Sequence, residues 1–278
     1  MRTNPRIINT LVRWGLNAQA YFTVAILVVI IGIIFFKGFP QVNFGFILSF
    51  PQDMGRHGGI FPAIVGTIQL ALLSILLATP LGVGTAIFLT EYTRESAFTK
   101  LIRFGVESLA GIPSILYGLF GFIFFVIKLR MGWSLLAGVL TLTIMILPTI
   151  IRTSEEAIRA VPRQLRIVSY SLSASKWETI KKVVLPAAMP GILTGIMLSI
   201  GRAVGETAAI IFTMGSSLRL PLSLMESGRT MAVHFYILAR EGISMEKAYG
   251  TAVVLVLSIL FINIIAYYIM NKTIARYS

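Results

Sequence analysis

The sequence is poor in the side chains on which soluble proteins and enzymes depend. It contains no cysteine among its 278 residues, which excludes disulfide bonds and thiolate metal sites. Charged residues make up only 13% of the chain, against about 25% in an average soluble domain. The phosphate-binding pattern G-x-x-x-x-G-K-[ST] does not occur, and no spacing supports a Ser-His-Asp triad or a metal-ligand cluster. We therefore expect no enzyme activity of the chain alone, no catalytic or metal site, and no directly bound cofactor.

Hydrophobic residues, by contrast, account for 56% of the chain. Segments without Asp, Glu, Lys or Arg are Trp14–Phe36, Gly58–Thr90, Ser108–Ile127, Met131–Ile151, Val183–Gly201 and Ala248–Asn271. A helix that spans a bilayer needs about 20 mostly apolar residues. The sequence therefore predicts an all-α integral membrane protein with six transmembrane helices in a single domain, 1–278. The helices are expected at about 20–36, 62–90, 106–127, 133–151, 193–214 and 251–271.

The distribution of the 24 basic residues predicts the orientation of the chain. If the N-terminus is cytoplasmic, fifteen lie on the inner side: Arg2, Arg6, Arg13, Arg94, Lys100, Arg103, Arg152, Arg159, Arg163, Arg166, Lys176, Lys181, Lys182, Lys272 and Arg276. Eight then lie on the outer side, with Arg202 inside the membrane: Lys37, Arg56, Lys128, Arg130, Arg219, Arg229, Arg240 and Lys247. Cytoplasmic loops carry the excess of Lys and Arg, so both termini are expected in the cytoplasm. The basic excess is a topology signal and not a nucleic-acid site.

Glycine and proline are concentrated inside the expected helices. Gly111 and Pro113 predict a kink in the third helix, because neighbouring helices can satisfy the backbone groups that such residues free. Gly191–Gly195 and Gly201–Gly205 both have the GxxxG spacing that lets two helices approach closely.

The long polar stretch 152–190 is expected to be a cytoplasmic loop. Its segment SYSLSAS interrupts a helical pattern, and Ser175 followed by Glu178 has the pattern of a capping box that starts a new helix. The break exposes Leu172, Ala174 and Trp177, and exposed apolar side chains often mark a contact site. A solvated loop that only fixes topology is the alternative, but the pattern favours a docking element.

This loop resembles the coupling loop of bacterial ABC importer permeases. The matching residues are Lys176, Trp177, Glu178, Thr179, Ile180, Val183, Leu185 and Pro186. The segments GIPSILYGLFG (111–121), LPTIIRTSEEAIRAVP (147–162) and GRAVGETAAIIFT (201–213) further resemble phosphate importer permeases, in particular the PstA-type subunit. The Glu-Ala-Ala positions of the family fall on Ile167, Val168 and Ser169, and its glycine at the break falls on Ser173.

The resemblance implies the type I permease fold of ABC importers, with a cytoplasmic coupling helix that docks on an ATP-binding subunit. It places the docking contact at Leu172, Ser173, Ala174, Ser175, Lys176, Trp177 and Glu178, which we call the docking segment. The implied partners are a second permease subunit (PstC-type), two ATP-binding subunits (PstB-type) that use the ATP, and an extracytoplasmic phosphate-binding protein (PstS-type). The implied function is that of a phosphate importer subunit in the bacterial cell membrane, forming half of the translocation path.

Two charged residues lie inside the fifth expected span. Arg202 and Glu206 are four residues apart, so we expect them on one helix face. A charge at the bilayer centre costs at least about 2.5–3.5 kcal/mol, and such residues are usually functional. One interpretation is an ion pair that fixes helix packing. The other is a substrate path, in which the planar guanidinium of Arg202 binds phosphate. Glu206 would then orient Arg202, or accept the proton that hydrogen phosphate carries and sulfate lacks.

Two other functions stay open. A permease for another oxyanion, such as molybdate or sulfate, would have the same architecture. A stand-alone ion-coupled carrier or channel belongs to a different class. Six spans without an inverted repeat count against a carrier, which would also leave the docking segment unexplained.

Overall fold

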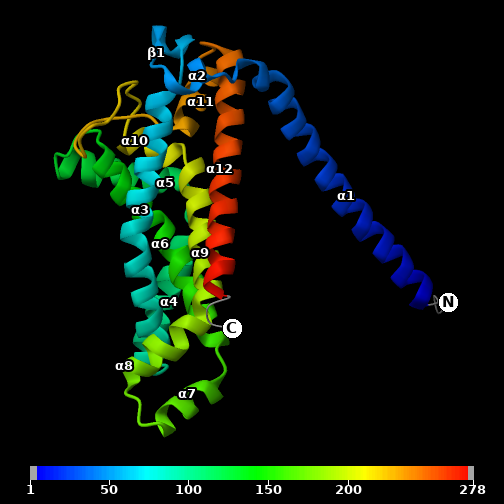
Figure 1. Cartoon of the computed structure of the whole chain (residues 1–278), viewed down its shortest axis with the longest axis vertical. Helices are drawn as coiled ribbons and strands as arrows, with labels where there is room; N and C mark the ends of the chain where they lie inside the picture. Colours follow the sequence, from blue (N-terminus) through cyan, green and yellow to red (C-terminus); the bar gives the residue numbers. More distant parts are fainter. Residues whose placement is uncertain (1–4, 275–278) are drawn as a thin grey trace.

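Long helices make up almost the whole molecule (Figure 1). The structure, a computed structural model, describes residues 5–274. Its longest helices are α1 Pro5–Gly38, α3 Phe61–Ile87, α6 Leu135–Ala160, α9 Leu185–Gly205 and α12 Met245–Ile274. Helices α3, α6, α9 and α12 lie side by side and form a bundle. Arg2, Arg276 and both chain termini lie outside the described residues.

The bundle is held together by a buried core where α3, α6 and α9 meet. Leu70 of α3, Leu142 of α6 and Val204 of α9 belong to this core and are almost completely buried. On the same α6–α9 interface, Gly195 lies directly against Thr153, and a side chain at position 195 would collide with it. The spacing of Gly191 and Gly195 predicted this close approach, and that prediction is confirmed, whereas among the described residues no helix lies against Gly201 or Gly205.

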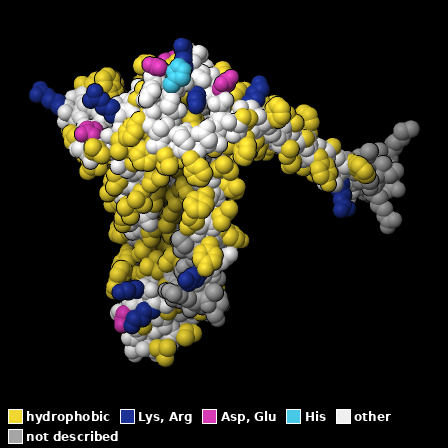
Figure 2. All heavy atoms as spheres, turned by 45° about the horizontal axis from the view of Figure 1, so that its top comes forward, with side chains coloured by type: hydrophobic (Ala, Val, Ile, Leu, Met, Phe, Trp, Pro, Cys, Tyr) yellow, Lys and Arg dark blue, Asp and Glu magenta, His cyan; other side chains and the backbone are white. Residues whose placement is uncertain are grey.

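Helix α1 stands apart from the bundle. At its C-terminal end Gly38 lies against the backbone of Tyr249 in α12, and from there the helix slants away from the other elements (Figure 1). Its apolar side chains are exposed along most of its length (Figure 2). This helix therefore has no partner within the described chain beyond its contact with α12 and the η1 turn, Phe39–Gln41, that follows it.

The helices of the described chain suit a membrane. By length and composition five of them can cross one, or six if the bent pair described below is one span. Figure 2 shows hydrophobic side chains along the flank of the bundle, with charged side chains gathered toward its two ends. The expected spans 62–90 and 251–271 fall within α3 plus its π-helical continuation η3 (Phe88–Tyr92) and within α12. Helices α1 and α6 extend beyond the expected 20–36 and 133–151, because a helix can continue past the charge that ends an apolar run.

The third expected span, 106–127, is not one helix. Helix α4 (Ala97–Ala110) is followed by α5 (Ser114–Gly121) and the π-helical segment η4 (Phe122–Lys128), and the two arms are bent by 101°. Pro113 separates them because it has no backbone N–H to continue a helix. The predicted kink is therefore confirmed, but the continuous helix is corrected to a broken one. The Tyr117 hydroxyl donates to the Leu109 carbonyl at 2.7 Å across the break, which satisfies a freed acceptor.

The fifth expected span, 193–214, is also interrupted. Helix α9 starts at Leu185 and ends at Gly205, and Glu206 is extended with φ −71° and ψ 130°. The chain resumes as the short helix α10, Ala208–Thr213. The expected single helix through both residues is therefore corrected: Arg202 lies in the last turn of α9, and Glu206 is the C-cap residue at which the helix ends. Glycine has a low helix propensity, so Gly205 is a favourable place for the helix to end.

Short elements close both ends of the bundle. One end carries α2 Phe44–Leu48, β1 Pro51–Gln52, η2 Asp53–Gly55, β2 His57–Gly58 and α11 Met231–Arg240, with β1 and β2 paired antiparallel. The other end carries α7 Arg163–Ser171, α8 Lys176–Thr179 and the π-helical segment η5, Ile180–Val184. The beginning of α1 and the end of α12 both point toward this α7/α8 end (Figure 1).

Candidate functional site

The docking segment forms a tight turn between α7 and α8. Helix α7 ends at Ser171, and Ser175 caps the start of α8. The Glu178 backbone N–H donates to Ser175 Oγ at 3.3 Å, and the Ser175 backbone N–H donates to the Glu178 carboxylate at 3.0 Å. The predicted capping box is thus confirmed. The Glu178 carboxylate accepts from the Ser175 backbone N–H, from the Ser175 hydroxyl at 2.8 Å and from Lys182, and these three bonds lower the pKa of the Glu178 carboxyl.

The turn itself depends on Ser173. This residue has a left-handed φ of +59°, the conformation that glycine adopts easily and that other residues reach at a cost of about 1–2 kcal/mol. It occupies the position at which the resembling family has glycine. A buried hydrogen bond of 2.8 Å between the hydroxyls of Ser169 and Thr179 joins α7 to α8 behind the turn. The left-handed geometry is therefore present although the glycine is not.

An apolar surface surrounds the turn. Leu172 is 78% exposed and Trp177 56% exposed, as the sequence predicts, whereas Ala174 is half-buried. Ile167 and Val168 of α7 add to this surface, and both are more than half exposed. Such a surface at the end of a membrane protein, beyond its apolar flank, is typical of a protein contact.

Arg202 lies in a groove between α9 and α12. The groove has a volume of about 380 Å³ and is lined by Thr194, Met197, Leu198, Gly201, Arg202, Asn263 and Tyr267. Arg202 is half-buried, and within the described residues its guanidinium forms no hydrogen bond or ion pair. The absence of a side chain at Gly201 leaves open space beside it. An arginine with all five of its donors free, held in an apolar helix, is suited to bind an anion.

The groove continues along α12 toward the α7/α8 end. A second hollow, of about 440 Å³, shares Met197, Asn263 and Tyr267 with the first and extends to Asn271. Asn263, Tyr267 and Asn271 are spaced four residues apart, which places them on one face of α12. We call these three residues the polar stripe. Sequence reasoning missed them, although their spacing within the apolar run INIIAYYIMN is a detectable signal.

Glu206 lies at the break between α9 and α10. One of its carboxylate oxygens accepts a hydrogen bond from the Ala209 backbone N–H at 3.1 Å. A carboxylate in this position satisfies one of the free N–H groups at the start of α10. No ion pair joins Glu206 to Arg202 within residues 5–274, so Glu206 does not orient Arg202 by direct pairing.

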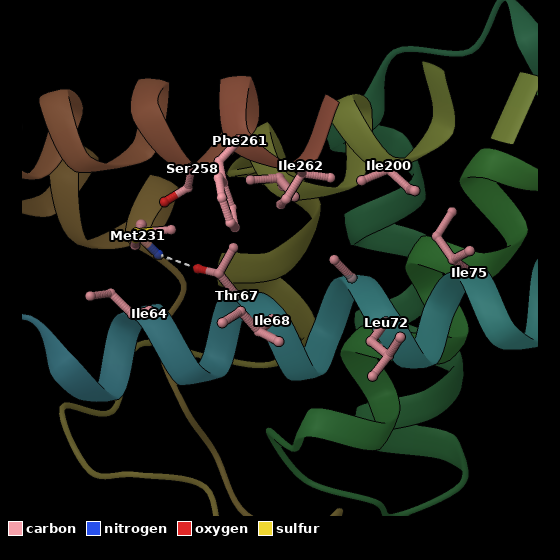
Figure 3. Close-up of a pocket in the computed structure, with 12 residues that line it drawn as sticks. Ile64, Thr67, Ile68, Leu72, Ile75, Ile200, Met231, Ser258, Phe261 and Ile262 are labelled. Atoms are coloured by element: carbon pink, nitrogen blue, oxygen red, sulfur yellow. Dashed lines mark hydrogen bonds between the residues drawn. The ribbon is translucent and has the colours of Figure 1, made fainter. Parts of the chain in front are cut away.

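A separate cavity between α3 and α12 is apolar (Figure 3). Its volume is about 380 Å³, and its walls include Ile68, Leu72 and Phe261. The hydroxyl of Thr67 in its wall is already engaged, since it accepts from the Met231 backbone N–H at 2.8 Å (Figure 3). With no charged group and no free donor to offer, this cavity does not suit an inorganic anion.

A buried polar cluster lies at the α2/α11 end of the molecule. Arg229 is 6% exposed and donates twice to the Ser216 carbonyl, at 3.0 and 2.7 Å. Its third contact is with Nδ1 of His234, at 3.1 Å. Burial lowers the pKa of Arg229 to about 10, and burial and the neighbouring Arg229 charge lower that of His234 to about 3. His234 is therefore a neutral acceptor, and the cluster fixes the 215–230 loop to α11. Sequence reasoning missed it, because Arg229 counts there only as a loop charge.

Metal binding has no support among the side chains of the described chain, since no three His, Asp or Glu residues group in a way that could hold an ion.

Comparison with known proteins identifies the family. Residues 78–277 match the family described as the binding-protein-dependent transport system inner membrane component. The chain belongs to this family. It is 34% identical over 279 residues to the probable ABC transporter permease protein YqgI of Bacillus subtilis, covering 95% of each chain. It is 36% identical over 212 residues to the phosphate transport system permease protein PstA 1 of Mycobacterium tuberculosis, covering 75% of this chain and 69% of the relative.

The fold agrees with this assignment. A chain of the bacterial alginate ABC transporter, solved in complex with an alginate pentasaccharide-bound periplasmic protein, superposes with a TM-score of 0.70 over 95% of each chain at 15% identity. This similarity concerns the fold. The chain thus has the type I ABC importer permease fold that its sequence resembles.

Proposed function

We propose that this chain is the transmembrane permease subunit of an ATP-driven importer of inorganic phosphate. Relatives that match most of the chain at 33–36% identity carry the name phosphate transport system permease protein PstA. The observation that carries the proposal is Arg202, an arginine without a partner in the described chain, in a groove on the flank of an apolar bundle. Phosphate is a ligand that matches the planar donors of a guanidinium.

The groove forms this subunit's half of the translocation path. Arg202 binds two phosphate oxygens in a bidentate manner, and the side chains of Asn263 and Tyr267 donate to the anion as it moves. Along the polar stripe the anion passes toward the α7/α8 end, which is the cytoplasmic side. On the α7/α8 side of Arg202, the polar stripe offers neutral donors, which favour release of the anion. An anion leaves a neutral amide or hydroxyl more readily than it leaves a second fixed positive charge.

Glu206 distinguishes hydrogen phosphate from sulfate. Its Oε1 accepts from Ala209, and within the described chain its Oε2 forms no hydrogen bond. Oε2 accepts a hydrogen bond from the P–OH group of hydrogen phosphate when the anion passes the α9–α10 break, and the proton stays on the phosphate. Sulfate has no such proton at neutral pH, so its negative oxygens would oppose the carboxylate.

The partners follow from the same surfaces. The docking segment binds one of two ATP-binding subunits, which supply the ATP hydrolysis that this chain's sequence cannot perform. A second permease subunit completes the path by covering the groove, and the exposed face of α1 adds to that interface. A phosphate-binding protein delivers the anion at the α2/α11 end. Both termini are cytoplasmic, in agreement with the direction of α1 and α12 in Figure 1.

The test is phosphate uptake by vesicles that contain the reconstituted complex. We expect uptake to require ATP inside the vesicles, the side on which the docking segment lies. Uptake should fall at least about tenfold in Arg202→Lys, which keeps the charge but loses the bidentate fork. Arg219→Lys is the matched control, since Arg219 is exposed in the 215–230 loop, and it should transport like the wild type. Normal uptake by a fully assembled Arg202→Ala complex would refute the binding role.

The same vesicles separate the alternative functions. Uptake of molybdate or sulfate in place of phosphate would identify a permease for another oxyanion. Transport without the ATP-binding subunits would identify a stand-alone carrier or channel.

A further inference from the structure

One buried ion pair ties the docking loop to a helix that is remote from it in sequence. Arg166 of α7 donates to Glu91 Oε1 through Nη2 at 2.7 Å and through Nε at 3.1 Å. Glu91 lies in the π-helical segment η3, at the end of α3. The side chains of Glu91 and Arg166 are only 8% and 17% exposed. This pair is therefore shielded from the water that weakens ordinary surface ion pairs.

The same arginine also holds the end of α6. Arg166 Nη1 donates to the Val161 carbonyl at 2.7 Å, and Nη2 donates to the Ile158 carbonyl at 3.0 Å. The last carbonyls of a helix lack partners within the helix and carry a partial negative charge, so a cation is favourable there. One guanidinium thus connects three elements: α7 itself, the end of α6 and the end of α3.

The backbone does not join the docking segment directly to α3. The docking segment continues directly into α9 through η5, and α7 follows α6 after Val161 and Pro162. Helix α3, which packs against both α6 and α9, is joined to the loop through side chains. Besides the Arg166 pair, Lys176 of the docking segment lies 4.9 Å from the ring centre of Tyr92. Tyr92 is 48% exposed, so this second contact is the weaker of the two.

We propose that Glu91 and Arg166 are a positioning pair that transmits movement of the docking segment to α3. With the pair intact, α3, α6 and α9 move together when the ATP-binding subunit moves the loop. Without it, the loop moves α9 and α6 while α3 stays behind, and ATP is hydrolysed without opening the path fully. Glu91 lies in the π-helical segment η3, and a second such segment, η5, packs against α7; π-helical segments are often found at functional sites. This inference rests on the proposed importer function.

The experiment measures ATP hydrolysed per phosphate delivered, in vesicles with the complete complex. Glu91→Ala removes the acceptor, whereas Glu91→Gln keeps an amide oxygen that can still accept from Arg166. We expect the ratio to rise at least about fivefold in Glu91→Ala and less in Glu91→Gln, with the ATP-binding subunits still co-purifying in full. The matched control is Arg159→Gln. Arg159 makes an equally short ion pair of 2.8 Å, but with Glu155 of the same helix, so its loss should leave the ratio unchanged.

A chemical cross-link between positions 91 and 166 gives a second test, which is independent of whether Glu91→Ala folds normally. The chain has no cysteine, so Glu91→Cys/Arg166→Cys contains only the two introduced thiols. This double variant should be poorly coupled, and a short flexible bismaleimide that joins the two thiols should restore coupling. An unchanged ratio in the variants, an equal rise in Arg159→Gln, or no recovery on cross-linking would overturn the proposal. A wild-type complex that does not take up phosphate would instead refute the proposed function.

Discussion

Acidification should destabilise the α2/α11 end of the molecule through one buried histidine. His234 is 1% exposed, and its pKa of about 3 lies well below the ordinary value of 6.5. Above pH 6.5 both the folded and the unfolded chain hold this imidazole neutral, and the stabilisation is complete. Between pH 6.5 and about 3, His234 is protonated in the unfolded chain but neutral in the folded chain, so stability falls as the pH falls.

The magnitude follows from the width of that window. Each pH unit below 6.5 costs about 1.4 kcal/mol, so lowering the pH from 7 to 5 should remove about 2 kcal/mol of unfolding free energy. Protonation would also set a cation against Arg229, whose guanidinium lies 3.1 Å from Nδ1. Glu241 raises the pKa of Arg229 and so helps to keep this guanidinium charged.

The assay is thermal unfolding of the purified chain in detergent at pH 7 and pH 5. His234→Asn keeps an acceptor near Nδ1 but cannot titrate, so its loss of stability between the two pH values should be smaller by about 2 kcal/mol. His57→Asn is the control, because His57 is exposed beside Asp53, and it should behave like the wild type. Equal pH dependence in wild type and His234→Asn would show that His234 titrates normally in the folded protein.

Three further predictions concern the loop and the topology. The double variant Leu172→Ser/Trp177→Ser should change the stability of the chain by less than about 1 kcal/mol, because both side chains are exposed. It should weaken binding of the ATP-binding subunit by about 2 kcal/mol or more, and full co-purification would contradict the docking role. Ser173→Gly should relieve the left-handed strain and slow amide hydrogen exchange in the loop up to about fivefold, and faster exchange would show that the serine is not strained. A reporter that is active only outside the cell, fused after Ser278, should give no signal. Strong reporter activity would show that the C-terminus is outside and that the predicted topology is wrong.

The positions of the helices could be predicted from the sequence, since a lipid-facing helix leaves a long uncharged run. Their continuity could not. Apolar composition is the same on both sides of a break, so the composition of 106–127 did not show that the bend would be as large as 101°. Pro113 marked the place, but the size of the bend depends on how the second arm packs. Phe212 of α10 lies against Gly118 of α5 and fills part of that space, a contact between segments far apart in sequence.

The docking segment could be predicted in more detail than any other part of the site. Its features are local: a capping box depends on two residues three apart, and the turn depends on one residue at the break. Arg166 was counted only as a topology charge, because nothing local connects it with Glu91, 75 residues away. Contacts of that kind appear only when the fold brings the ends of α3, α6 and α7 together.

The pairing of Arg202 with Glu206 failed for a related reason, and the failure changes the chemistry. The apolar run predicted a helix that continues past Glu206, whereas α9 ends at Gly205 and the following N–H groups need another acceptor. A direct ion pair would have neutralised Arg202 and left little attraction for an anion. With the helix broken, Glu206 turns to the N–H of Ala209, and Arg202 keeps its full charge toward the groove. The end of α9 therefore gives the Glu206 carboxylate a backbone partner in place of Arg202, and this arrangement makes an anion path along α9 physically reasonable.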